Sequence, residues 1–228
     1  MCAGRTDAGV HATGQVAHVD LPADFDGDLL RAVNRQLAPR IVVREAAPTT
    51  GDFDARRSAT SRHYRYLVWN ALVPDPLLAG LAWHVAEPLD VKAMAAATDP
   101  LLGEHDFRAF CRRPPGRPAG EPIVRRVTVA GWRAVRQTWA WADEPGTSDE
   151  PAPPRLLRFD VAAGSFCHQM VRSIVAVLVD AGRGRATAAS VMALLAAGSR
   201  AGSPQPAPSY GLCLVGVGYG TGTGTGTG

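Results

Sequence analysis

The sequence predicts a fold that combines helices and strands. Residues 62–69 alternate between two kinds of side chain with the two-residue period of a β-strand. Between residues 166 and 178, apolar side chains recur every three to four positions, which is typical of a helix with one buried face. The chain has 228 residues, of which 46% are hydrophobic and 20% charged, so it is long enough and apolar enough to form a hydrophobic core.

The other elements follow along the chain. Alternation at 15–20 predicts a short strand, and apolar positions spaced for one face predict a helix over 26–37 that ends before Pro39. Further on, the pattern predicts a strand at 41–43, a helix at 91–97 with Asp90 as N-cap, a strand pair or one long bent strand at 123–136, a strand at 156–161, a helix at 188–197 ending at Gly198, and a strand at 211–217. We expect a disordered hairpin tip at 143–154 and a flexible Gly-Thr tail at 220–228.

Composition narrows the class of protein. Net charge is +3, and Lys92 is the only lysine among 24 basic residues. Arginine suits phosphate binding and base stacking, although a bias in codon composition explains its excess equally well. No apolar run is long enough to span a bilayer, and the start shows no charged region followed by an apolar core, so we expect no signal peptide. The four cysteines are scattered without a Cys-x-x-Cys pair, so we predict no zinc knuckle, no disulfide framework and a reducing, cytoplasmic setting.

One loop of small residues near the start carries an isolated acid. Asp7 lies between Arg5 and Gly9, and the charge of Arg5 favours the ionised form of the acid. Gly4 and Gly9 allow a tight turn or a close approach to a ligand. A carboxylate placed in this way can act as a nucleophile, a general base or a metal ligand, or it can simply cap a structural turn.

A metal site is the weakest of these alternatives. His11, His18 and Asp20 are the nearest candidate ligands, but their spacing matches no common ligand pattern. We therefore expect no metal, and we rank a metal-dependent phosphoesterase last among the functions considered.

Two further segments contain residues suited to nucleic acid. One face of the strand predicted at 62–69 carries Arg62, Tyr64 and Tyr66, which can hold phosphates and stack on a base. Tyrosines in such a pattern are more often half-buried cross-strand partners. His168 and Arg172 are four residues apart, so we expect them to share a helix face.

A basic loop follows at 111–117, which includes Arg112, Arg113 and Arg117. Such a loop suits a nucleic-acid backbone when it lies beside a cleft, and it is equally typical of a solvated surface.

Four motifs in order resemble the TruA family of bacterial tRNA pseudouridine synthases. They are GRTDAGVH at 4–11, FDARRSATSRHYRY at 53–66, FCHQMVRSIV at 166–175 and GLCL at 211–214. The resemblance extends from residue 2 to about residue 217. Enzymes of this family isomerise uridine to pseudouridine in the anticodon arm of tRNA.

The resemblance implies an α+β fold, the pseudouridine synthase fold, in which two related halves join antiparallel sheets flanked by helices around a basic cleft. On this basis, residues 1–70 are the remainder of an N-terminal half, with the Asp7 loop and the Arg-x-Tyr-x-Tyr strand, and residues 71–219 form the C-terminal half. Family members carry several dozen residues before the first motif, so we expect the first strand and helix to be missing here. Their absence would leave strand edges uncovered.

The resemblance also implies roles for individual residues. Asp7 would be the catalytic aspartate, Arg172 its partner, and Tyr64 the ring that stacks on the target base. Substrate contacts are expected from Arg5, Arg62, Tyr66, His168, Leu212 and Leu214. The target nucleotide has to leave its stack to enter a pocket. No cofactor and no metal are implied, because the uracil stays bound, rotates and rejoins through carbon.

Together these expectations describe an isomerase, a tRNA pseudouridine(38–40) synthase acting on the anticodon stem-loop. It would be a cytoplasmic homodimer that holds one tRNA across both subunits, with no membrane partner. The alternative is a catalytically impaired RNA-binding fragment of the same family.

Overall fold

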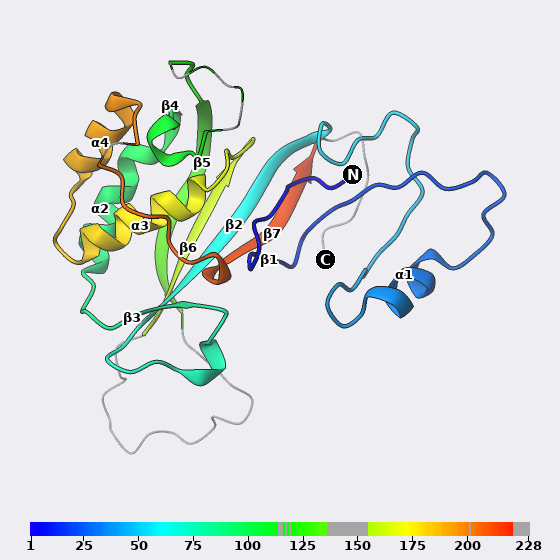
Figure 1. Cartoon of the computed structure of the whole chain (residues 1–228), viewed down its shortest axis with the longest axis horizontal. Helices are drawn as coiled ribbons and strands as arrows, with labels where there is room; N and C mark the ends of the chain where they lie inside the picture. The colour runs from blue at the N-terminus through cyan, green and yellow to red at the C-terminus, as the bar shows by residue number, and fades with distance from the viewer. Residues whose placement is uncertain (114–115, 117, 119, 136–154, 201, 221–228) are drawn as a thin grey trace.

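A seven-stranded sheet runs through the molecule, and three helices cover one of its faces (Figure 1). The structure is a computed structural model that describes residues 1–220, apart from 114–115, 117, 119, 136–154 and 201. The covering helices are α2 (Val91–Thr98), α3 (Met170–Gly182) and α4 (Ala188–Ala197). Helices and one mixed sheet together make an α+β fold, as the sequence predicts.

The strands follow the order β1-β7-β2-β6-β5-β4, and β3 pairs with the end of β2. Their bounds are β1 His11–Ala12, β2 Ala59–Asn70, β3 Trp83–Val85, β4 Gly103–Asp106, β5 Val124–Val135, β6 Leu156–Ala163 and β7 Leu212–Tyr219. The pairs β1–β7 and β2–β3 are parallel, and the other pairs are antiparallel. The sheet therefore places β7, from the end of the chain, between β1 and β2 from its beginning.

Strand β2 forms where the alternation predicts it, and one of its faces is buried. Tyr66 and Val68 are fully buried, and Tyr64 and Arg62 are only 8% and 9% exposed. They belong to or border the core that includes Ile174 and other residues of α3. The two tyrosines are thus core residues of the sheet, which is the commoner outcome for this pattern.

The helices predicted in the second half of the chain form within a few residues of their expected bounds. At the start of α2, the side chain of Asp90 accepts hydrogen bonds from the backbone N–H groups of Lys92 and Ala93. Gly198 ends α4 in the left-handed region with φ +56°. Helix α3 starts later than residue 166, because Gln169 has φ +65° and interrupts the helical backbone.

The segment before β2 differs most from expectation. The predicted strands at 15–20 and 41–43 are wrong, since the first provides only a single bridge between Ala17 and Cys2 and the second is irregular. Helix α1 (Leu29–Leu37) does form, capped by Asp28. None of its residues is buried, and it lies away from the sheet (Figure 1). An apolar stripe shows that a helix is amphipathic but does not say whether a partner covers it.

Within the segment predicted at 123–136, Val124–Val135 form one long strand, β5, rather than a strand pair. The predicted hairpin tip at 143–154 lies outside the residues that the structure describes. The same holds for the Gly-Thr tail beyond Gly220 and for several positions of the basic loop at 111–117. Among the described helices, none is long and apolar enough to cross a membrane.

The expectation of no disulfide is wrong. A disulfide joins Cys111 to Cys167, whose Cα atoms are 5.7 Å apart. Cys111 follows the short 3₁₀ helix Arg108–Phe110, and Cys167 lies in the turn before α3. The two cysteines are 56 residues apart in sequence, so only the packing of these segments reveals the pair.

A buried acid, Asp160 of β6, lies against half-buried side chains on the opposite face of β2. Its Oδ1 contacts Arg65 Nε at 2.9 Å and His63 Nε2 at 3.3 Å, and its Oδ2 contacts Arg158 Nε at 2.8 Å and Arg133 Nε at 3.2 Å. Burial raises the pKa of Asp160, but the hydrogen bonds from Arg65 and Arg158, together with the charges of Arg158 and Arg133, hold the pKa below its usual range.

This cluster predicts a pH-dependent loss of stability. We expect Asp160→Asn to lower the free energy of unfolding at pH 7 by about 2–3 kcal/mol, because the arginines lose a shared buried charge. A lowered pKa stabilises the folded state above the unfolded value of about 3.9, and this contribution disappears as the pH falls through the folded value. The difference in the free energy of unfolding between variant and wild type, measured by urea denaturation, should therefore become smaller at acidic pH. A difference that stays constant down to the lowest pH at which the wild type folds would contradict this assignment.

Candidate active site

Asp7 is held through both of its carboxylate oxygens. Arg172 Nη1 donates to Oδ2 at 2.9 Å, and His168 Nε2 contacts Oδ1 at 3.1 Å. The Arg172 side chain is 16% exposed and that of Asp7 29% exposed, so the pair is partly shielded from water while the acid keeps an open side. Arg172 is anchored at its other end, where Nε donates to the carbonyl of Ala207 at 2.7 Å. The carboxylate therefore has a fixed direction.

His168 reaches Asp7 from the turn before α3, not from the helix itself. The expectation that His168 and Arg172 share a helix face is wrong, because the left-handed backbone at Gln169 separates them. His168 in the turn and Arg172 in the first turn of α3 nevertheless both contact Asp7. The turn is further held by the backbone N–H of Arg112, which donates to the carbonyl of His168 at 2.9 Å.

The loop around Asp7 is closed by contacts that the sequence did not reveal. Gln15 Nε2 donates to the carbonyl of Gly4 at 2.7 Å, and Gln15 Oε1 accepts from the Gly4 N–H at 3.3 Å. Gly9 has φ +82°, and a Cβ there would lie 2.7 Å from Ser209 Oγ, so this position requires glycine. The only sequence signal for Gln15 was its place just after the first motif.

Tyr64 lies next to this loop. Its ring packs edge-on against Phe166, with centroids 5.2 Å apart, and a Cβ on Gly4 would be 3.4 Å from the Tyr64 hydroxyl. Burial raises the pKa of Tyr64; the charge of Arg62 lowers it and that of Asp7 raises it further, and the net effect is upward. The hydroxyl therefore stays protonated at neutral pH. Phe166 is a neighbour of Tyr64 that the sequence did not single out.

Part of the chain matches a known family. The family model described as tRNA pseudouridine synthase matches residues 97–220, a range that includes His168 and Arg172. The chain belongs to this family. Pseudouridine synthases are isomerases.

Curated relatives extend the likeness to most of the chain. The tRNA pseudouridine synthase A of Bordetella petrii is 40% identical over 200 residues, which cover 86% of this chain and 66% of the relative. That of Methylobacterium nodulans is 42% identical over 196 residues, covering 85% and 69%. That of Frankia casuarinae is 42% identical over 187 residues, covering 80% and 60%. The matched region is thus about two thirds of the length of these relatives.

Three residues expected to contact substrate in this family member are buried. Tyr66 is fully buried, and its hydroxyl donates to the carbonyl of Pro208 at 2.7 Å. Leu214 is also fully buried and Leu212 is 6% exposed. A Cβ on Gly4 would lie 3.8 Å from the Leu214 side chain, so Leu214 packs beneath the loop. As the structure stands, these side chains support the site from within the core.

Arg62 is also buried, and its two terminal nitrogens donate hydrogen bonds to backbone carbonyls. Nη1 donates to Ala59 at 3.1 Å and Gly164 at 2.6 Å, and Nη2 donates to Ala3 at 3.0 Å and Arg56 at 2.7 Å. One guanidinium thereby connects the Asp7 loop, the turn before β2 and the segment that leads to His168. In this structure the two terminal nitrogens of Arg62 are used within the protein, and a contact between Arg62 and substrate stays a prediction.

We expect Arg62→Met to lower the free energy of unfolding by about 3 kcal/mol, since buried carbonyls lose their donors. Arg62→Lys should recover only part of this, because one ammonium group cannot reach carbonyls on three segments. Urea denaturation measures both effects, and Arg31→Met, at an exposed site in α1, is the control. Equal stability of Arg62→Met and the control would rule out this role.

The remaining candidates lie apart from one another. Arg5 is exposed and forms no ion pair or hydrogen bond with the residues described. His11 Nε2 contacts the carbonyl of Gly80 at 2.8 Å, and His18 Nδ1 accepts from the Ala55 N–H at 2.9 Å. The two histidines thus form hydrogen bonds with backbone groups in different parts of the chain. Within the described part of the chain, no group of three histidine, cysteine or acidic residues is arranged to hold a metal ion.

Proposed function

We propose that this protein isomerises uridine to pseudouridine in tRNA, and that its targets are positions 38–40 of the anticodon stem-loop. The observation that supports the chemistry most directly is the carboxylate of Asp7, oriented by Arg172 and His168. Membership of the tRNA pseudouridine synthase family and the printed names of its relatives support the substrate.

In the proposed reaction, the bond between ribose C1′ and uracil N1 breaks and a bond from C1′ to C5 forms. The proton on C5 is lost to solvent, and N1 gains one. Asp7 acts on the extruded nucleoside as a charged carboxylate, either as a nucleophile or as the base that removes a ribose proton. Both routes need the oriented oxygen that Arg172 and His168 provide.

Tyr64 is proposed to stack on the extruded base and to assist a later proton transfer. Its closeness to the Asp7 loop supports this role, and so does its protonated hydroxyl. Arg5, which is exposed at the same loop, is proposed to hold the displaced RNA backbone. The scheme uses no metal or cofactor, because the uracil remains bound throughout.

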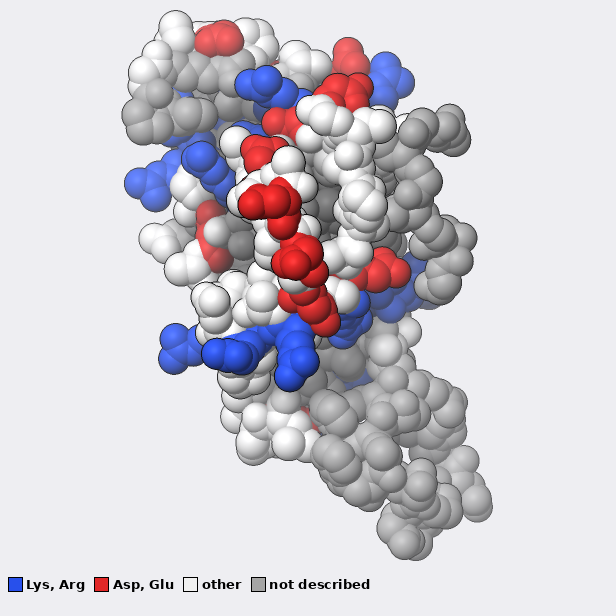
Figure 2. All heavy atoms as spheres, turned by 90° about the vertical axis from the view of Figure 1, so that its right-hand side faces the viewer, with Lys and Arg blue, Asp and Glu red and all other residues white. Residues whose placement is uncertain are grey.

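We further propose a cytoplasmic homodimer that holds one tRNA across both subunits. Figure 2 shows acidic side chains in a row down the side of the molecule that carries α1, with basic side chains at the borders of the row. A phosphate backbone is repelled by such a row, so the RNA is proposed to approach by other faces. Sedimentation with and without tRNA tests the stoichiometry, and a single subunit on each tRNA would contradict it.

The function is tested with an unmodified tRNA transcript that carries tritium at uridine C5. We expect tritium release together with pseudouridine at one or more of positions 38–40, mapped by primer extension after chemical labelling. Release with pseudouridine only elsewhere would contradict the proposed positions. A folded protein that binds the transcript but releases no tritium would contradict the proposed chemistry.

A further inference from the structure

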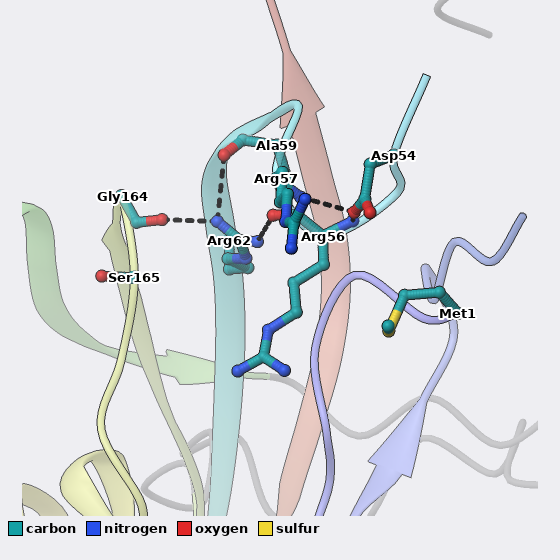
Figure 3. A pocket seen from close by; sticks show the side chains of 8 residues that line it. All are labelled: Met1, Asp54, Arg56, Arg57, Ala59, Arg62, Gly164 and Ser165. Atoms are coloured by element: carbon teal, nitrogen blue, oxygen red, sulfur yellow. Dashed lines mark hydrogen bonds between the residues drawn. The ribbon is translucent and has the colours of Figure 1, made fainter. Parts of the chain in front are cut away.

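A cavity of about 540 Å³ opens beside the active-site loop, at the start of β2 (Figure 3). The lining residues that matter here are Asp54, Arg56, Arg57, Arg62, Gly164 and Ser165. Two features connect the cavity to the site: Arg62 donates to Ala3 in the Asp7 loop, and Ser165 immediately precedes Phe166, which packs on Tyr64. The cavity is therefore linked to the candidate active site through two of its lining residues, Arg62 and Ser165.

The walls of this cavity carry surplus positive charge. Arg56 and Arg57 are exposed, and neither forms an ion pair with any residue that the structure describes. Figure 3 shows the Arg56 guanidinium extending clear of the other residues drawn. Among the described residues that line the cavity, Asp54 is the one acid; its carboxylate accepts hydrogen bonds from the backbone N–H groups of Arg57 and Arg56 at 2.8 Å each, and these bonds lower its pKa. The carboxylate of Asp54 therefore also stabilises the turn that contains Arg56 and Arg57.

Arg62 adds a third positive charge at the floor of the cavity. Its guanidinium is bonded to backbone carbonyls, and no carboxylate of the described residues pairs with it. Carbonyl dipoles solvate the guanidinium but do not neutralise its charge. The surrounding protein has a low dielectric constant, so the positive potential is concentrated in the opening of the cavity. The cavity therefore favours binding of an anion, and the guanidinium groups of Arg56 and Arg57 can donate hydrogen bonds to it. Ser165 adds a hydroxyl donor at the rim.

The distance to the active site suits a neighbouring nucleotide. Arg62 and Tyr64 are two residues apart on the same face of β2, which corresponds to about 7 Å along the strand. This is comparable with the separation of adjacent nucleotides in an extended single strand. A base lying against Tyr64 would thus leave a phosphate of the same strand close to the cavity.

We propose that this cavity binds one phosphodiester group of the RNA substrate, one or two nucleotides from the uridine held at Asp7, and that Arg56 and Arg57 are its ligands. The inference rests on the proposed function for the identity of the RNA. Such a contact fixes the register of the strand and carries no base specificity. It would hold the nucleotide next to the extruded uridine while that uridine leaves its stack.

The protein side of the test compares Arg56→Gln/Arg57→Gln with Arg31→Gln, which removes an exposed arginine from α1 outside the cavity. The dissociation constant for tRNA is measured over a series of salt concentrations. Losing one phosphate contact should reduce the slope of log K against log salt by about 0.7 to 0.9 and weaken binding about tenfold at low salt. The control should keep the wild-type slope. A double variant with the slope of the control would overturn the proposal.

The RNA side of the test replaces single phosphates near the target uridine with neutral methylphosphonates. Wild-type protein should lose affinity at one position within two nucleotides of the uridine, and the double variant should be insensitive there. Equal losses in both proteins at every position would overturn the proposal. Failure of the proposed function looks different: the wild type would make no pseudouridine, while the slope difference would persist. Thermal unfolding of each variant checks that these exposed substitutions leave the fold intact.

Discussion

Asp7→Asn is expected to abolish tritium release from C5-labelled tRNA, with a loss of at least about a thousandfold. Asparagine has nearly the size of aspartate and can still accept from Arg172 Nη1, which lies 2.9 Å from Oδ2 in the wild type. An amide oxygen carries no full charge, so it is neither an effective nucleophile nor a base. The substitution thus removes the chemistry and changes the geometry little.

Single-turnover measurements with excess protein separate this effect from product release. Binding of tRNA to Asp7→Asn, measured by filter retention, serves as the control for folding. Retained binding with lost release is the expected pattern, because the substitution leaves the proposed phosphate ligands Arg5, Arg56 and Arg57 unchanged. A variant that releases tritium at a rate close to that of the wild type would show that Asp7 is not the catalytic group.

Arg172→Met is expected to lower the rate of the chemical step by roughly a hundredfold, because the carboxylate loses the group that fixes its direction. Methionine keeps much of the length and apolar volume of arginine. It cannot donate a hydrogen bond to Asp7 Oδ2 or to the carbonyl of Ala207. Lysine at this position should recover part of the rate through its charge, but it cannot hold both acceptors in the geometry of a guanidinium.

Arg183→Met is the matched control for this prediction. Arg183 follows the same helix at its other end and pairs with Glu87 at 3.0 Å, so its loss perturbs α3 without touching Asp7. Urea denaturation of both variants shows how much stability each loses. Equal rates for Arg172→Met and Arg183→Met would indicate that Arg172 acts only through stability and does not orient the acid.

The sequence predicts best where short-range rules decide the outcome. The alternation in β2 and the cap at Asp90 depend on residues within a few positions of one another, and both are found in the structure. The motifs likewise placed Asp7, His168 and Arg172 among the candidates, and the folded chain brings them within 3.1 Å.

The sequence predicts poorly where a segment depends on a partner that the pattern cannot name. The spacing of apolar residues correctly predicted a helix at α1, yet no residue of α1 is buried. Arg62 and Tyr66 belong to a row that suits RNA contact but more often packs in a sheet, and in the structure both residues are buried. Amphipathicity is a property of a segment, whereas burial is a property of two segments in contact.

From the sequence alone come the class of fold, most of the helices and strands after residue 58, and the acid at the centre of the candidate site. The tertiary structure alone decided that Arg62 connects three loops, that Cys111 meets Cys167, and that two residues on either side of Gln169 converge on Asp7. Local patterns report how each segment folds, because their causes lie within a few residues. Contacts between distant segments form only when the sheet places those segments next to each other. The order of the strands depends on the whole chain, so no single segment predicts it.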